Sequence, residues 1–471
     1  MKFPILQYIR NASGSIIFWI IIYFLIRLIG ITNPPLESVH NWRQSFTCMI
    51  ARNFLEINPN ILYPQIDMTG NMSGYVGSEF PIFNYIIFLV ARICGYQHWY
   101  GRLINLIISS IGIYFFSFLT EKFLGKKVAI ASGIILLSSI WFSFSRKIMP
   151  DTFSVSLMFI GLYFCISYIN KGSRFHLWLF ILFASLGSLA KLPTITYLSL
   201  LAIPLFSNNQ SAQIKKGLLL GIFIVTSFTA AWYLYWVPRL VENYHNQLFY
   251  PKSIPEGFLE LIRDWPDTLE KFYFSSFHSF IAFACFLVGI YLVIRDKKKY
   301  LVIAFFLYFS VFLVVMMKFG NFFSSHSYYI IPFTPLMAVI AGYTVIRIPV
   351  KFYILLLLAI AIEGIMNQQH DFFIRKYQSY KIDLEQIADS ISNRNDLVII
   401  NDKGSPQLLY LAHRKGWSVD DETVSDDKKM QSLTESGARY LIIDRKSFKG
   451  ALDYPLVYQD DHFTVFKLGS P

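Results

Sequence analysis

Acids and a histidine of this 471-residue chain stand beside long apolar segments, where an ionisable side chain needs a partner or a function. Glu79 precedes the apolar stretch 81–95, and Asp151 opens a later one. Glu37 and His40 lie in the string NPPLESVHNWRQ, just after the first apolar stretch. A carboxylate or an imidazole can take a proton from a hydroxyl, so these four residues are the candidate catalytic bases.

Cationic, amide and aromatic side chains accompany those acids. Cations form charge-assisted hydrogen bonds with phosphate, and such bonds stabilise negative charge that builds up during a reaction. The candidates for substrate binding are Arg43, Gln44, Arg102, Lys191, His326, Tyr328 and Tyr329. Glu79 and Asp151 could also share a divalent metal ion with a phosphate, although no ligand spacing in the sequence demands one.

Several of these residues also have a purely structural interpretation. Arg102 and Lys191 stand at the ends of apolar segments, from which cations commonly snorkel to lipid headgroups. Tyr328 and Tyr329 could belong to an aromatic belt at the membrane interface. Asp151, after a proline, suits the N-terminus of a helix. The topology of the chain therefore has to show whether these side chains can meet.

About eleven apolar segments between residues 15 and 366 must position these side chains. Each is near the roughly 20 residues with which a helix crosses hydrocarbon. The predicted spans are residues 15–32, 101–121, 128–145, 153–170, 176–191, 193–207, 217–237, 276–294, 300–317, 328–346 and 352–366. Together with a hydrophobic content of 54%, they predict a polytopic α-helical membrane protein.

Basic clusters fall in every second gap between these spans. Cytoplasmic loops are enriched in Lys and Arg, so the clusters orient the chain. The basic groups are Lys2 with Arg10, Lys122 with Lys126 and Lys127, Lys171 with Arg174, Lys215 with Lys216, Arg295 with Lys297, Lys298 and Lys299, and Arg347 with Lys351. We expect the candidate site residues on the opposite, external side. The net charge of +12 is then explained by anchors that face anionic membrane lipid, and no nucleic-acid partner is expected.

The largest predicted external loop covers residues 33–100. Apolar residues from Trp42 to Phe54 recur there at helical spacing with polar residues between them, which predicts an amphipathic helix at the membrane surface. The stretch 81–95 is short and is interrupted by Arg92, so we expect a re-entrant or surface helix rather than a span.

The character of the chain changes at about residue 367, where apolar runs shorten to strand length. Strand patterns at 397–400, at 440–444 and twice after residue 455 accompany helical patterns at 407–414 and 426–436. This order predicts a small external α/β domain at 367–471, after a transmembrane catalytic domain at 1–366.

The order of these features resembles the GT-C glycosyltransferases, in particular the bacterial branch related to protein O-mannosyltransferases and the aminoarabinose transferase of lipid A. The resemblance covers roughly residues 15–366. The strings that carry it are HNWRQSFTCMIARNF (40–54), EFPIFNYIIFLVARICG (79–95), the opening at Arg102, MPDTF (149–153), AKLPT (190–194) and HSYYIIPFTP (326–335).

The resemblance implies transfer of a sugar from a polyprenyl-phosphate donor to a glycan, lipid or protein acceptor, with inversion at the anomeric carbon. It places the reaction on the periplasmic side of a bacterial cytoplasmic (inner) membrane. Lys191, Arg102 and His326 would then bind the donor phosphate. The alternatives are a lipid-linked oligosaccharide ligase or polymerase, and a membrane transporter or flippase, which would carry its charges near the span centres.

One departure from the family pattern concerns the first surface helix. The family usually carries an acid several residues before a segment like IARNF, and here Arg43 stands at about that place. The nearest acid upstream is Glu37. Glu79 and Asp151 match the family's acids, whereas the first acid has no counterpart at the same position.

The topology predicts that the tail after residue 367 is external. In a variant without native cysteines, a cysteine in place of Asp420 should react in intact cells with a membrane-impermeant thiol reagent, since the positive-inside rule places the tail outside. A cysteine in place of Lys298 is the control and should be protected. Protection at position 420 together with labelling at 298 would reverse the topology.

Overall fold

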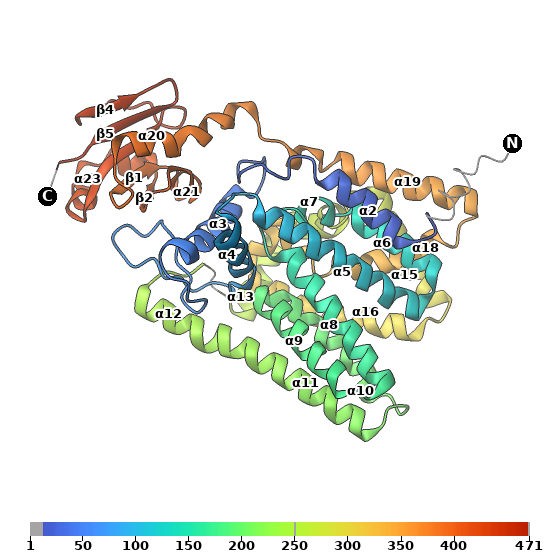
Figure 1. The fold of residues 1–471 in the computed structure, drawn as a ribbon. Coiled ribbons are helices and arrows are strands. Elements are labelled where there is room, and N and C mark those ends of the chain that lie inside the picture. The colour runs from blue at the N-terminus through green and yellow to red at the C-terminus, as the bar shows by residue number, and fades with distance from the viewer. Residues whose placement is uncertain (1–12, 249–250, 470–471) are drawn as a thin grey trace. The chain divides into compact units, whose positions relative to one another are not determined.

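The computed structural model of the protein describes residues 13–248 and 251–469. The described chain forms two compact units (Figure 1). The helical unit comprises residues 13–31, 102–235 and 251–372, and the mixed unit comprises 32–101, 236–248 and 373–469. This division differs from the predicted boundary after residue 366, because the first loop groups with the tail.

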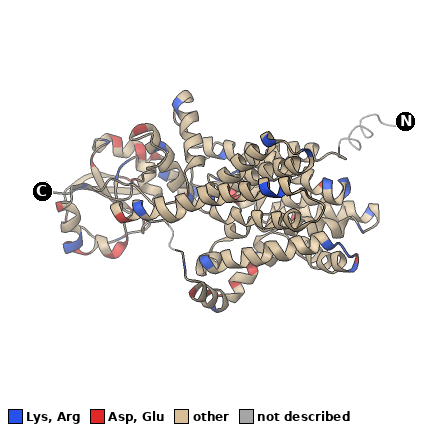
Figure 2. Cartoon of the chain, turned by 90° about the horizontal axis from the view of Figure 1, so that it is seen from below, with Lys and Arg blue, Asp and Glu red and all other residues tan. Residues whose placement is uncertain are grey.

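The helical unit consists of helices joined by short turns. In chain order it contains α2 (Ile16–Arg27), α5 (Tyr100–Leu124), α6 (Lys126–Ser138), α7 (Trp141–Phe144), α8 (Asp151–Lys171), α9 (Arg174–Ala190), η1 (Leu192–Leu201), α10 (Ala202–Phe206), α11 (Ala212–Ala230), η2 (Ala231–Trp236), α13 (Ile254–Arg263), α14 (Trp265–Glu270), η3 (Lys271–Ser275), α15 (Phe280–Arg295), α16 (Lys299–Phe319), α17 (Asn321–Ser325), η4 (Ser327–Ile330), α18 (Thr334–Val345), α19 (Val350–Met366) and η5 (Gln369–Phe372). Charged residues are sparse along these helices, whereas acidic and basic residues are frequent and mixed in the tail (Figure 2).

Every predicted span contains at least one of these helices. Among the described residues, four are long and apolar enough to cross a membrane by themselves: α5, α8, α16 and the continuous helix Ala212–Tyr244. A fifth candidate joins Trp265–Ser275 to Phe280–Arg295 across a bend of 94°. The remaining segments hold shorter helices, so the number eleven remains a prediction.

Small residues bring neighbouring helices of this unit close together. A methyl group on Gly187 in α9 would lie 2.8 Å from the carbonyl oxygen of Ser154 in α8. Gly289 in α15 approaches the backbone of Ile340 in α18 in the same way. Such positions allow helices to pack through backbone contacts, which is how membrane helices commonly associate. The packing of α8 against α9 positions the two ends that carry Asp151 and Lys191.

The mixed unit begins with the first loop, which forms α3 (Asn41–Glu56) and α4 (Ile82–Cys94) and is joined by α12 (Val237–Tyr244). The helix predicted at 42–54 is present, but its polar side is not exposed to water. Arg52 and Asn53 are buried and bind the Asp67 carboxylate at 3.0 and 2.8 Å. The polar residues of α3 therefore form internal contacts rather than a solvated face.

The tail is an α/β fold, as predicted. It contains η6 (Lys376–Asp383), α20 (Leu384–Ile391), β1 (Leu397–Asn401), α21 (Gln407–Ala412), β2 (Gly416–Val419), α22 (Asp421–Val424), α23 (Asp427–Glu435), β3 (Ala438–Asp444), β4 (Leu456–Gln459) and β5 (Phe463–Lys467). The sheet order is β2-β1-β3-β5-β4, with β1 parallel to β2 and β3, and β5 antiparallel to β3 and β4. The sequence patterns missed β2, which begins with a glycine and contains a serine.

Gly416 begins β2 where no side chain fits. A methyl group there would overlap the backbone of Val398 in β1. Its N–H donates to the Asp67 carbonyl at 2.9 Å, and its carbonyl accepts from the Gly70 N–H at 2.7 Å. This glycine therefore joins the tail sheet to the first loop within the mixed unit.

We predict that Gly416→Ala destabilises the protein, because β1 and β2 must separate to accommodate the methyl group. Overpacking of this kind costs about 1–3 kcal/mol. The measurement is the thermal unfolding temperature of the purified full-length chain. Gly469→Ala is the matched control, since its methyl group would meet no atom within 4 Å. Equal unfolding temperatures for the two variants would contradict the described β1–β2 pairing.

Candidate active site

The loop between α7 and α8 is held in place by Asn105 of α5, which is fully buried. The Asn105 Nδ2 donates at 2.8–3.1 Å to three carbonyl oxygens, those of Phe144, Lys147 and Met149. Its Oδ1 accepts from the hydroxyls of Ser109 and Thr152 at 2.9 and 3.0 Å. One amide thereby fixes the loop and the first turn of α8, where Asp151 lies.

Asp151 and Lys191 meet within the helical unit. The Lys191 Nζ lies 3.5 Å from the Asp151 Oδ1, and both side chains are less than 10% exposed. Beside them, the hydroxyls of Ser154 and Thr194 are 2.9 Å apart. Lys191 is thus buried at the end of α9 rather than snorkelling to the surface.

Two predicted aromatic residues complete this cluster. The Lys191 Nζ lies 5.2 Å from the ring centroid of Tyr328 and 5.6 Å from that of Tyr329. Both distances fit cation–π attraction. Tyr328 and Tyr329 are themselves buried, so they do not form an exposed aromatic belt.

His326 lies beside the two tyrosines, with its ring centroid 5.2 Å from that of Tyr328. Its Nδ1–H donates to the Phe322 carbonyl, with 3.1 Å between the atoms. Burial lowers the pKa of His326 below its ordinary value, and the nearby charge of Lys191 lowers it further. The surroundings of His326 therefore disfavour its charged form.

Two cations, Arg146 and Lys147, lie on the α7–α8 loop that Asn105 holds. The Lys147 Nζ forms a buried ion pair with the Asp371 Oδ2 at 2.9 Å. The Arg146 guanidinium lies 4.1 Å from the ring centroid of Phe372. Arg102 is fully buried and donates to the Arg146 carbonyl at 3.4 Å. Arg102 is thus a buried donor to the loop, which excludes the snorkelling interpretation for it.

Within the mixed unit, Glu79 is paired with Arg43. The Arg43 Nη2 lies 2.5 Å from the Glu79 Oε2, and both side chains are less than 20% exposed. Arg43, predicted from the sequence as a substrate-binding residue, is thus the counter-charge of Glu79. Arginine beside a carboxylate favours its ionised form, the form that can accept a proton.

The other candidates of the mixed unit lie near the start of α3. Glu37 is fully buried, accepts from Asn33 Nδ2 at 3.4 Å and forms a backbone bridge to Ile374. His40 precedes α3 with a φ of 63°, and its carbonyl accepts from the Gln44 N–H at 3.1 Å. These contacts shape the entry to α3 and give no separate evidence for chemistry.

The structure therefore groups the predicted residues into two sets. Asp151, Lys191, His326, Tyr328 and Tyr329 form one cluster in the helical unit. The second set pairs Arg43 with Glu79 in the mixed unit. Sequence reasoning missed Asn105 and Asp371; an asparagine within an apolar span was the available signal for the first. Among the described residues, no group of three or more His, Cys, Asp or Glu side chains is arranged to hold a metal ion.

Comparison with known proteins concerns the fold of the chain. Residues 78–236 match the family described as dolichyl-phosphate-mannose-protein mannosyltransferase. The crystal structure of ArnT from Cupriavidus metallidurans bound to undecaprenyl phosphate superposes with a TM-score of 0.64 at 13% identity, covering 95% of this chain and 98% of that one. The chain has the fold of the GT-C glycosyltransferases. The predicted family resemblance is thereby confirmed.

A second GT-C protein shares the fold. The archaeal oligosaccharyltransferase AglB from Archaeoglobus fulgidus, in complex with an inhibitory peptide and a dolichol-phosphate, superposes with a TM-score of 0.56 at 12% identity. The alignment covers 91% of this chain and 69% of AglB. No curated protein matches the chain in sequence. Within the matched family segment lie Glu79, Arg102, Asp151 and Lys191.

Within the mixed unit, the tail contacts helix α3 through His413. The His413 Nε2 lies 2.8 Å from Glu56 of α3, and its Nδ1 lies 2.9 Å from Glu385 of α20. Arg52 adds a hydrogen bond to the Tyr410 carbonyl at 3.0 Å. Only the doubly protonated imidazolium can donate to both carboxylates at once.

Both partners of this contact titrate away from their ordinary values. Burial opposes the charge on His413, but the hydrogen bonds to Glu385 and Glu56 raise its pKa above 6.5. The hydrogen bond to His413 and one to Arg394 lower the pKa of Glu385 to about 2. Arg52 is the further charge that faces His413, and it opposes protonation.

We predict a pH-dependent contribution of His413 to stability. Because its folded pKa is raised, the contribution is complete below about pH 6.5 and is lost as the pH rises through the folded pKa. Glu385 contributes above about pH 4.5 and loses its part as the pH falls toward 2. The partly exposed carboxylates limit the effect to about 1 kcal/mol.

The measurement is the unfolding temperature of wild type and His413→Gln between pH 5 and pH 9. The difference between them should shrink with rising pH. His245→Gln is the matched control, since that histidine is exposed and lies outside the tail. A constant offset for His413→Gln across the range would show that the contact does not depend on protonation.

Proposed function

We propose that this chain transfers a sugar from a polyprenyl-phosphate donor to an acceptor hydroxyl on the periplasmic side of a bacterial inner membrane, with inversion. The GT-C fold and the mannosyltransferase segment support a glycosyltransferase. ArnT, which shares the fold, is a protein crystallised with undecaprenyl phosphate. The acceptor class, whether glycan, lipid or protein, is left open by this proposal.

The buried Asp151–Lys191 pair is the observation that carries the proposal. A lysine held beside two tyrosines at the end of an apolar helix suits a phosphate that is attached to a lipid tail. A phosphate bound at Lys191 would compete with Asp151 for the ammonium group. Donor binding would thus release the Asp151 carboxylate and make it available for a new contact.

Two carboxylates could take the proton from the acceptor. Glu79 lies against the Arg43 guanidinium, and Asp151 becomes available when phosphate engages Lys191. Displacement at the anomeric carbon by the deprotonating hydroxyl would invert that carbon, with the lipid phosphate as leaving group. Charge that builds on the phosphate would be stabilised by Lys191. A divalent ion bound by Glu79 or Asp151 would serve the same purpose.

A second candidate function is transfer of a whole lipid-linked oligosaccharide. The similarity to the oligosaccharyltransferase AglB favours it, because that protein shares the fold over 91% of this chain. The two functions differ in the donor. The first uses a single sugar on a polyprenyl monophosphate, whereas the second uses a whole oligosaccharide on a lipid carrier. A transporter is the less favoured class, because the polar clusters lie at helix ends and in loops.

We expect Lys191→Ala to lose most sugar transfer from a polyprenyl-phosphate donor, whereas Lys191→Arg retains part of it. A point charge suffices to hold a phosphate, although the larger guanidinium fits this buried position less well. Transfer is measured with purified protein and a labelled donor. Lys171→Ala, at the far end of α8, is the control. Full activity of Lys191→Ala would show that Lys191 does not bind the donor phosphate.

We expect Glu79→Gln and Asp151→Asn to reduce turnover unequally. Removal of the base should cost on the order of 10²–10⁴ in rate, whereas loss of an orienting carboxylate should cost less. Unfolding temperatures measured alongside distinguish a damaged fold from lost chemistry. Near-normal transfer by both variants would exclude this catalytic assignment and return attention to Glu37 and His40.

A further inference from the structure

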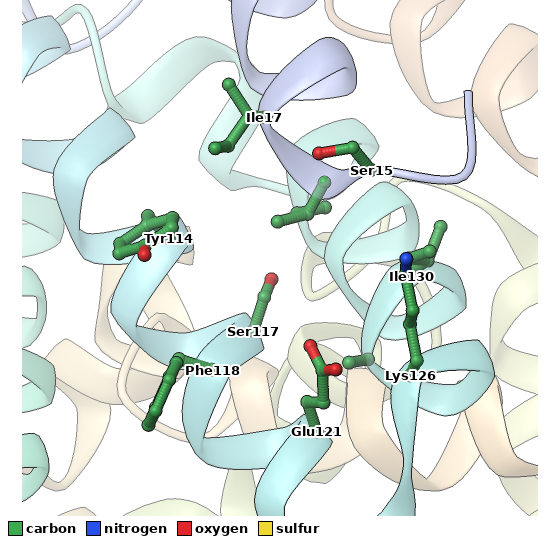
Figure 3. A pocket seen from close by; sticks show the side chains of 10 residues that line it. Ser15, Ile17, Tyr114, Ser117, Phe118, Glu121, Lys126 and Ile130 are labelled. Carbon is green, nitrogen blue, oxygen red and sulfur yellow. The ribbon is translucent and has the colours of Figure 1, made fainter. Parts of the chain in front are cut away.

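A pocket separate from the Asp151–Lys191 cluster opens between α2, α5 and α6 of the helical unit (Figure 3). Apolar side chains and side chains with polar groups both line it. The lining residues are Ser15, Ile16, Ile17, Tyr114, Ser117, Phe118, Glu121, Lys126, Ala129 and Ile130. The basic cluster around Lys126 places this end of the helices on the predicted cytoplasmic side.

The two charges of the pocket stand at unfavourable helix ends. Glu121 lies in the last turn of α5, where the partial negative charge of the helix repels an acid. Lys126 is the first residue of α6, where the partial positive charge repels a cation. Within the described part of the chain, neither side chain has an ion-pair partner within 4.0 Å or a side-chain hydrogen bond. Each charge is therefore placed where a counter-charge from a ligand would relieve it.

A buried hydroxyl adds an independent observation. Ser117 is 2% exposed, and its Oγ has no hydrogen-bond partner among the described residues. It lines the pocket on the same helix as Glu121, one turn earlier. A buried hydroxyl without a partner costs free energy, so a ligand atom that accepts its proton would be bound favourably.

We propose that this pocket binds a phospholipid whose headgroup carries a primary amine. The ammonium donates to the Glu121 carboxylate, and the phosphate accepts from Lys126 and the first turn of α6. Ser117 donates to an oxygen of the glycerol ester region. An acyl chain lies along Ile17, Phe118 and Ile130.

The charge pattern selects this headgroup over other common ones. A choline headgroup has no N–H to donate to Glu121, and a glycerol headgroup has no cation to pair with it. A zwitterionic headgroup also matches the pocket in charge, because Glu121 can pair with its ammonium and Lys126 with its phosphate. The lipid would bridge α5, α6 and α2 at the level of the headgroups.

The first test uses the purified full-length chain in detergent after removal of lipid. Phosphatidylethanolamine, phosphatidylcholine and phosphatidylglycerol with identical acyl chains are titrated, and the rise in unfolding temperature gives an apparent affinity for each. Phosphatidylethanolamine should bind tightest. Glu121→Gln should weaken its binding about tenfold, to the level of phosphatidylcholine. Lys127→Met is the control, since Lys127 does not line the pocket.

The second test exchanges the two charges. The double variant Glu121→Lys with Lys126→Glu places each charge at the helix end that favours it, so its unfolding temperature without lipid should rise. Its preference for phosphatidylethanolamine should be lost. Equal binding of the three lipids by wild type, or an unchanged preference in the charge exchange, would overturn the proposal. If Lys127→Met weakened phosphatidylethanolamine binding as much as Glu121→Gln does, general surface charge would explain the binding. That result would overturn the proposal as well.

Discussion

The Asn105 amide is the contact on which the Asp151–Lys191 cluster depends. A loop among apolar helices leaves carbonyl groups without water, and each needs a donor from the protein. Asn105 shares its two N–H groups among three such carbonyls and accepts two hydroxyls in return. Without that amide the α7–α8 loop would lose its fixed path. The carboxylate of Asp151 would then lose its fixed relation to Lys191 on the neighbouring helix.

Buried charges in both units are compensated by specific partners. Asp151 lies beside Lys191, and Lys147 lies beside Asp371. In the mixed unit, Arg52 contacts Asp67 and Arg43 contacts Glu79. Removing one partner leaves the other charge buried alone, which costs several kcal/mol, so stability and reactivity at these positions are coupled. An anionic substrate would find cations already desolvated and in place, without reorganisation of water.

The tail contacts α3, the helix that also carries Arg43. Its helix α21 contacts Arg52 in the middle of α3, and His413 contacts Glu56 at the end of that helix. Arg43, which pairs with Glu79, lies near the other end of the same helix. Because a helix moves as a rigid body, contacts at one end constrain the other.

The sequence by itself determined what depends on local pattern. The long apolar segments predicted the helices, and the short apolar runs of the tail predicted β1, β3, β4 and β5. The order of the short sequence strings predicted the family resemblance, which the fold confirms. The pairing of Arg43 with Glu79, the burial of Lys191 beside Asp151, and the function of Asn105 were decided only by tertiary structure. These contacts join residues that are 36 to 44 positions apart in the sequence. Helical periodicity specifies which face of a helix a residue occupies, but it does not specify which distant residue the side chain contacts. Burial of polar groups in an apolar surrounding then selects the partners, because each buried donor and acceptor must be satisfied.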